Sequence, residues 1–111
     1  MKSYTDLEQS KKLAEFLPIE SADMHCFVAD SLEKQEINYA IRCGTPLVKT
    51  DIPCWSLSAL LDILPTGKVL LHDKGNHGYK CICNNIDSYY FNNPIDACYE
   101  MILKLHKLNL L

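Results

Sequence analysis

The sequence contains no run of 18 apolar residues, which is about the length that a helix needs to cross a lipid bilayer. It also has acidic residues, Asp6 and Glu8, where the apolar core of a secretory signal would begin. Both absences favour a cytoplasmic protein without membrane contact, in which cysteine thiols stay reduced.

Basic residues are slightly outnumbered, because 11 Lys and Arg stand against 14 Asp and Glu and give a net charge of −3. Proteins that bind nucleic acid usually show a basic stripe or patch instead. The lysines of the 68–80 region, Lys68, Lys74 and Lys80, are spaced singly, as on a solvated hairpin. We therefore expect no nucleic-acid partner.

Sequence motifs of catalysis are also missing. No nucleophile elbow, phosphate-binding loop or zinc-helix motif occurs. A Cys–His nucleophilic pair, for example Cys54 with a histidine, needs a base within hydrogen-bond reach, which the sequence does not give. We predict no catalytic residue and no cofactor, and we favour a non-enzyme over a small hydrolytic or thiol enzyme.

Cysteine is more frequent than usual, with six in 111 residues. That share stays below the roughly 8–10% of disulfide scaffolds. Four of the six lie within or beside apolar runs and resemble small buried hydrophobes: Cys26, Cys43, Cys54 and Cys98. We expect six free thiols, no disulfide and no stoichiometric metal.

Cys81 and Cys83 form the most metal-like feature, because residues i and i+2 of a strand share a face. His72 and His77 lie on the expected partner strand and its loop, and two thiolates with two imidazoles make a tetrahedral zinc site. The spacing is not the usual one of two residues between paired cysteines, and no second pair follows. Core cysteines explain the pattern better, and a zinc-binding module of these four residues is the alternative function.

Residues 51–65 predict a short central helix with a marked start and end. Ser56 is a good N-cap, and Trp55 before it with Leu60 after it forms a hydrophobic staple. Pro65 disfavours helical geometry at Leu64 and ends the helix there. We expect Trp55 and Leu60 to be buried and in contact.

The rest of the chain predicts two further helices and four to five strands. A capping box at residues 5–8 opens the first helix, which Pro18 ends, and Asn93 with Pro94 starts the last helix. Alternating side chains predict strands at residues 22–29, 37–43, 68–72 and 79–84, with one more at 88–91. The buried stripe of the last helix is Cys98, Met101, Ile102, Leu105 and Leu108.

The expected fold is one α+β domain over residues 1–111, with an antiparallel sheet of four to five strands and three helices in the order α-β-β-α-β-β-(β)-α. A short echo links LAEFLP at 13–18 to LLDILP at 60–65, each followed by two predicted strands. The echo indicates either a duplicated unit or two amphipathic helices that both end before proline. The shortness of the match favours the second explanation.

Aromatic and leucine residues gather late in the chain. Tyr89 and Tyr90 stand next to Phe91, and they either pack under the last helix or anchor a partner protein. Leu110 and Leu111 are left over from the core face of that helix, so they either dock on the protein's own sheet or form a contact patch. Our candidate interaction residues are Tyr89, Tyr90, Leu110 and Leu111.

Four stretches carry a resemblance: SKKLAE at 10–15, ESADM at 20–24, IPCWSLSALL at 52–61 and PIDACYEMILKL at 94–105. Together they resemble a group of uncharacterised small proteins carried by phages and prophages of anaerobic gut bacteria. The resemblance covers the helices well and the sheet poorly, and it implies an intracellular, mobile-element setting without a catalytic residue. The leading hypothesis is a non-catalytic phage or prophage accessory protein that acts through contacts with a partner protein or with itself.

Overall fold

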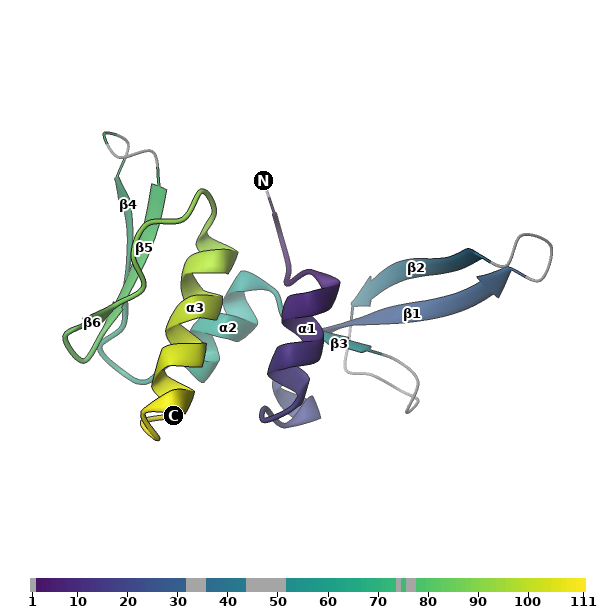
Figure 1. The fold of residues 1–111 in the computed structure, drawn as a ribbon, viewed down its shortest axis with the longest axis horizontal. Helices are drawn as coiled ribbons and strands as arrows, with labels where there is room; N and C mark the ends of the chain where they lie inside the picture. Colours follow the sequence, from purple (N-terminus) through teal and green to yellow (C-terminus); the bar gives the residue numbers. More distant parts are fainter. Residues whose placement is uncertain (1, 32–35, 44–51, 74, 76–77) are drawn as a thin grey trace. The chain divides into compact units, whose positions relative to one another are not determined.

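The computed structural model describes residues 2–31, 36–43, 52–73, 75 and 78–111, with the backbone alone for 27–31 and 36–43 (Figure 1). The chain has an α+β fold and divides into two compact units. The first unit is Asp6–Ser56, and the second is Leu57–Leu111 together with Met1–Thr5. The single domain expected from the length stays a prediction.

The first unit contains α1 (Leu7–Ala14), a 3-10 turn η1 (Ile19–Ser21) and the strands β1 (Met24–Ser31), β2 (Glu36–Cys43) and β3 (Ile52–Cys54). Its sheet has the order β2-β1-β3, and both pairings are antiparallel. The expected pairing of β1 with β2 is confirmed. The strand β3 was missed, because three residues that include a proline give too short an alternation to predict a strand.

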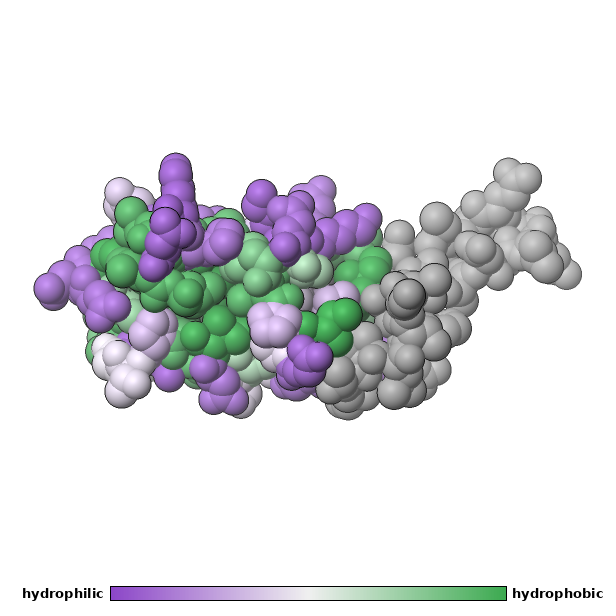
Figure 2. Space-filling model, turned by 90° about the horizontal axis from the view of Figure 1, so that it is seen from below, coloured by the Kyte–Doolittle hydropathy of each residue, from purple (hydrophilic) through white to green (hydrophobic). Residues whose placement is uncertain are grey.

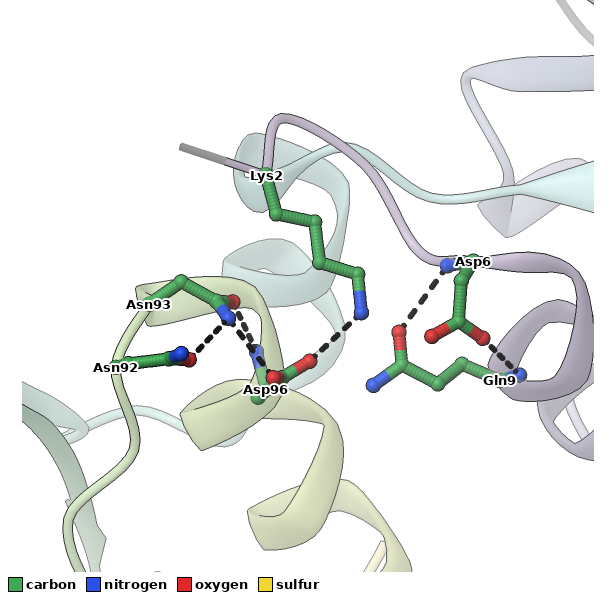
Figure 3. A network of polar contacts seen from close by, with 6 residues as sticks. All are labelled: Lys2, Asp6, Gln9, Asn92, Asn93 and Asp96. Carbon is green, nitrogen blue, oxygen red and sulfur yellow. Dashed lines mark hydrogen bonds and ion pairs between the residues drawn. The ribbon is translucent and has the colours of Figure 1, made fainter.

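Helix α1 begins one residue later than the sequence predicts. The N-cap is Asp6, whose carboxylate accepts from the Gln9 backbone N–H at 2.8 Å, while the Gln9 side chain accepts from Asp6 N–H at 3.1 Å (Figure 3). The capping box at 5–8 is therefore wrong by one position. The helix also ends at Ala14 and not at Pro18, and the chain continues in looser turns such as that from Leu17 N–H to Leu13 C=O.

Trp55 anchors the end of the first unit. Its side chain is fully buried, and its indole N–H donates to the Ser21 hydroxyl at 3.0 Å. The Ser56 backbone N–H donates to the Asp23 carboxylate at 3.0 Å, and the Ser56 hydroxyl donates to the other oxygen of the same carboxylate. The predicted burial of Trp55 and Leu60 is confirmed, and their contact stays a prediction.

The second unit contains α2 (Leu57–Ile63), β4 (Val69–Asp73), β5 (Gly78–Cys83), β6 (Ile86–Asp87) and α3 (Pro94–Lys107). Its sheet has the order β4-β5-β6, again antiparallel. Helix α3 contacts β5 and α2. Asn84 and Asn85, at φ angles of 52° and 65°, make the tight turn from β5 to β6, in the left-handed conformation that Asn tolerates best among residues other than Gly.

Helix α3 starts as the sequence predicts. The Asn93 side chain accepts from the Asp96 backbone N–H at 2.9 Å, and Pro94 occupies the first turn. The Lys2 ammonium lies 2.8 Å from the Asp96 carboxylate and ties the N-terminal segment of this unit to the same turn (Figure 3). An acidic group in the first turn also suits the helix dipole. The buried face comprises Ile95, Ala97, Cys98, Met101, Ile102 and Leu105.

Three expectations for the sheet and α3 are wrong. The described strands form two three-stranded sheets and not one sheet of four to five, because β3 pairs with β1 before α2 begins. The strand expected at 88–91 is a two-residue strand at 86–87 followed by a single bridge from Tyr79 to Phe91. Leu108 is 55% exposed, since it lies past the end of α3 and off the buried face.

Candidate interaction site

The sheet of the second unit has a buried face and an open face. Cys81 and Cys83 of β5 are fully buried and therefore face the core, where α3 contacts β5. Side chains alternate along a strand, so Lys80 and Ile82 point to the opposite face. The register places Leu71 opposite Lys80 and Val69 opposite Ile82, which puts these two exposed residues on the open face as well.

The buried face holds a pair of neighbouring thiols. The Cys81 and Cys98 side chains share a hydrogen bond, which lowers the pKa of Cys81 and, together with burial, raises that of Cys98. Burial also raises the pKa of Cys83. Both sulfurs of the proposed zinc motif are therefore part of the α3–β5 core.

The imidazole of His72, which was expected beside these sulfurs, lies at the surface and contacts an aromatic ring. His72 is exposed, and its ring stacks on Tyr79 with centroids 4.2 Å apart and an interplanar angle of 5°. His77 lies outside the described residues. Within the described ranges, no three His, Cys, Asp or Glu side chains come together as metal ligands.

A second cysteine pair, Cys26 and Cys54, lies in the first unit. Met24 of β1 faces Cys54 of β3, so Cys26 is the diagonal neighbour of Cys54 on the same face, and both thiols are buried. Burial raises the pKa of Cys54 despite a hydrogen bond with Ser10, and a buried thiol with a raised pKa is a poor nucleophile. None of the five cysteines whose side chains are described forms a disulfide, and the side chain of Cys43 lies outside the described part.

Among the large hydrophobic side chains of the described residues, that of Tyr89 is the most exposed, at 70%. Its φ angle is +67°, a left-handed conformation that is strained for an aromatic residue. The chain holds it from both sides. The Ser88 hydroxyl accepts from Cys81 N–H and donates to Tyr89 C=O, both at 2.9 Å, and the Lys104 ammonium lies 4.2 Å from the centre of the tyrosine ring.

Tyr90 lies on the open face, away from Lys104. The Lys80 ammonium is 5.2 Å from the centre of its ring, and the same ammonium pairs with the Asp87 carboxylate at 3.1 Å. A Cβ atom at Gly78 would come within 2.9 Å of Phe91 C=O and 3.1 Å of the Tyr90 Cβ, so only glycine lets this segment lie against β5. The two adjacent tyrosines are thus presented on opposite sides of the sheet.

The residues after α3 are ordered but not buried. Asn109, at a φ of 57°, lets its own N–H reach His106 C=O and the Leu110 N–H reach Leu105 C=O, which is a Schellman motif. Leu108, Leu110 and Leu111 remain exposed. Leu110 and Leu111 are therefore not buried against the protein's own sheet, which was one of the two expectations for them.

The candidate residues divide into two surfaces. Lys104 donates to Asp87 C=O at 2.7 Å, covers the Tyr89 ring, and stands one helical turn before Leu108. We group Tyr89 with the exposed leucines that follow α3, namely Leu108, Leu110 and Leu111, and call this group the Tyr89 surface. Lys104 of α3 connects its two parts, and Tyr90 is not included because it lies near Lys80. Figure 2 shows hydrophobic residues, in green, at the surface of the unit that contains α3 and β4–β6.

Sequence reasoning missed the residues that hold this site in place. The sequence analysis assigned Leu108 to the core and Ser88 to a strand, and it gave Lys104 no place in the site. The positive φ of Tyr89 leaves no mark in the sequence, because Tyr is not a typical left-handed residue.

No family model, curated protein or solved structure matches the chain. In the described part of the chain, no helix is both long enough and apolar enough to cross a membrane.

Proposed function

We propose that this protein is a non-catalytic accessory protein of a phage or prophage and that it acts by binding a partner protein through the Tyr89 surface. The mobile-element setting comes from the resemblance of its helices to small phage and prophage proteins. The mode of action is supported by where apolar side chains remain exposed in the second unit.

The observation that carries the proposal is the conformation of Tyr89. An aromatic residue in the left-handed region costs on the order of 1–3 kcal/mol, and such strain concentrates at functional positions. Here the strain presents the ring to solvent and does not bury it in the core. The hydrogen bond from Ser88 holds the backbone of Tyr89, and the Lys104 ammonium lies over its ring, so the side chain is positioned before any partner arrives and less entropy is lost on binding.

The surface has the composition of a contact centre. Tyr is enriched among residues that dominate binding energy, because one rigid side chain offers a large apolar area and a hydroxyl. Leu108, Leu110 and Leu111 add exposed apolar area close together in the sequence, and the Schellman motif holds their backbone in place. Lys104 supplies a positive charge beside the ring, so a partner with an acidic group at the rim of its contact suits this surface.

A site-specific cross-link tests the proposal. The photoreactive residue p-benzoylphenylalanine is placed at Tyr89 of the full chain in cells that carry the gene, and at the exposed Ser58 of α2 as a control. We expect one discrete covalent adduct from position 89, at least tenfold above the yield from position 58. A Leu111→Ser change in the same chain should reduce that adduct.

The proposal fails if the probe at Tyr89 gives no more adduct than the probe at Ser58. The zinc-binding alternative has less support, because the Cys81 thiol shares a hydrogen bond with Cys98 in the core and His72 stacks on Tyr79. One zinc ion per chain in protein made without an affinity tag, lost on Cys83→Ser, would establish that alternative instead.

A further inference from the structure

Strand β4 presents an open edge of its sheet. The neighbouring strand β5 is bonded on both of its sides. On the side away from β4, Tyr79 exchanges hydrogen bonds with Phe91, at 2.6 and 2.8 Å, and Cys81 C=O accepts from Ser88 N–H at 2.9 Å. The backbone groups of an antiparallel strand alternate in direction, so Gly78, Lys80 and Ile82 bond to β4. Their register partners on β4 are Asp73, Leu71 and Val69.

The backbone N–H and C=O groups of the intervening residues, Leu70 and His72, therefore point away from β5. Among the residues that the structure describes, no strand pairs with this side of β4. The open face beside the edge is apolar, because Val69 is 45% exposed and Leu71 is 42% exposed. Proteins usually protect such an edge with a charge, a proline, a bulge or a very short strand. The charges near β4 stand at its ends, where Asp73 is its last residue and Lys68 directly precedes it, and Val69–His72 between them carry no acidic or lysine side chain and no proline.

We infer that the open edge of β4 pairs with β4 of a second copy, antiparallel and centred on Leu71. This register places Leu70 of each copy opposite His72 of the other, so two residues per copy exchange all their outward hydrogen bonds. The two β4–β5–β6 sheets then form one continuous six-stranded sheet. The contact uses a surface different from the Tyr89 surface and does not depend on the proposed function.

Self-pairing suits the side chains of the edge as well as its backbone. The two Leu71 side chains meet at the two-fold axis on the open face, with each Val69 beside them. Val69 stands opposite Asp73 of the other copy, so no two like charges face each other among β4 residues Val69–Asp73. This two-fold symmetric pairing requires a second copy of the same chain, which is present wherever the protein is made, and it does not apply to a strand of another protein.

The contact is small, since a five-residue strand edge covers less than the roughly 1,200 Å² of a standard stable interface. The association is therefore reversible and depends on protein concentration. Sedimentation velocity over a concentration series should show the mean mass rising from one chain towards two.

A charge exchange tests the register. Leu71→Lys and Leu71→Glu each place like charges opposite one another at the two-fold axis, so each variant alone should associate at least tenfold more weakly than the wild type. An equal mixture of the two should regain the association, because Lys then faces Glu. Ile19→Lys, which makes the same change at an exposed residue of η1, should associate as the wild type does.

A cysteine pair tests the same register where a charged variant does not fold. Leu71→Cys should give a covalent dimer with oxidised glutathione, which accepts the two electrons and two protons as the interchain disulfide forms. Val69→Cys on the same strand should not, because its symmetry mate lies four residues away along the pairing. A wild type that stays monomeric at every concentration overturns the inference. Equal cross-linking from both positions, or no recovery in the Lys–Glu mixture of folded variants, also overturns it.

Discussion

The two edges of the β4–β5–β6 sheet differ in how their backbone hydrogen-bonding groups are satisfied. At the β6 edge, Lys104 donates to Asp87 C=O, Ser88 bonds to Cys81, and the following segment bridges to Tyr79. At the β4 edge, the register leaves Leu70 and His72 directed outward. Within the described residues, the chain satisfies the hydrogen-bonding groups of one edge and pairs no strand with the other, and β4 is therefore the edge for which we infer a second copy.

The comparison also separates what each residue does for stability from what it does for binding. Residues at the β6 edge have partners within the chain, so their loss should unfold the protein more easily. The exposed side chains of β4, such as Val69 and Leu71, do not lie in the core. Replacing them should therefore leave the stability nearly unchanged and weaken the association. The predictions below test this separation, from the largest expected effect on stability to the smallest.

The core sets the scale for both edges. Leu60 of α2 is fully buried, and Leu60→Ala should lower the free energy of unfolding by ~2–5 kcal/mol, as cavity formation in a core does. Urea denaturation followed by circular dichroism measures it. The exposed Leu111→Ala should change the same quantity by less than ~0.5 kcal/mol. An unchanged stability of Leu60→Ala would show that α2 is not a core helix.

Breaking the β6 edge at Ser88 should have the next largest effect. Ser88 is fully buried, and Ser88→Ala leaves the Cys81 N–H without its acceptor, which costs ~1–3 kcal/mol. The same denaturation experiment measures the loss, with Ser58→Ala at an exposed position of α2 as the matched control. If the two variants are equally stable, the Ser88 hydroxyl does not stabilise this edge.

Removing the lysine that closes the β6 edge should have a moderate effect. Lys104→Met keeps the length of the side chain but loses the bond to Asp87 C=O and the contact with the Tyr89 ring, at a cost of about 1 kcal/mol. Lys107→Met, in the last turn of α3 and exposed, is the control. The account of a closed edge is wrong if both variants melt at the same temperature.

The ion pair on the open face should have the smallest effect, and that effect should disappear in acid. The hydrogen bond from Lys80 lowers the pKa of Asp87, so the pair stabilises the fold above the unfolded carboxyl pKa of about 3.9 and loses its effect as the pH falls through the folded pKa. The melting temperatures of wild type and Lys80→Met should therefore differ slightly at pH 6 and converge below about pH 3. If the two melting temperatures still differ below about pH 3, the stabilising effect of Lys80 comes from its packing against Tyr90 and not from the ion pair.

Much of the fold could be predicted where a local rule decides it. Asn93 with Pro94 fixed the start of α3, and the alternation of residues 37–43 matched a strand, because capping and side-chain period act within a few residues. The division into two sheets could not be predicted, because it depends on β3, whose pairing with β1 spans about thirty residues of chain.

The candidate site could be predicted in residue type but not in arrangement. Leu110 and Leu111 were singled out as leucines that the core face of the last helix does not use, and Tyr89 and Tyr90 as aromatic residues that either pack under that helix or anchor a partner. All four are exposed. That the adjacent tyrosines lie on opposite sides of the sheet follows from the left-handed φ of Tyr89 and from the space at Gly78, which are tertiary features. The open edge at β4 is likewise a property of register and not of composition.

Residue-resolved amide exchange at low and high protein concentration tests the open edge of β4 most directly. Three consecutive amides give opposite expectations: Leu71 N–H bonds to β5 and should exchange slowly at both concentrations, whereas Leu70 and His72 N–H should exchange fast when dilute and slowly when concentrated. Slow exchange of all three in dilute protein would mean that the edge is already paired within the chain. Fast exchange of Leu70 and His72 at every concentration would mean that no second copy binds there.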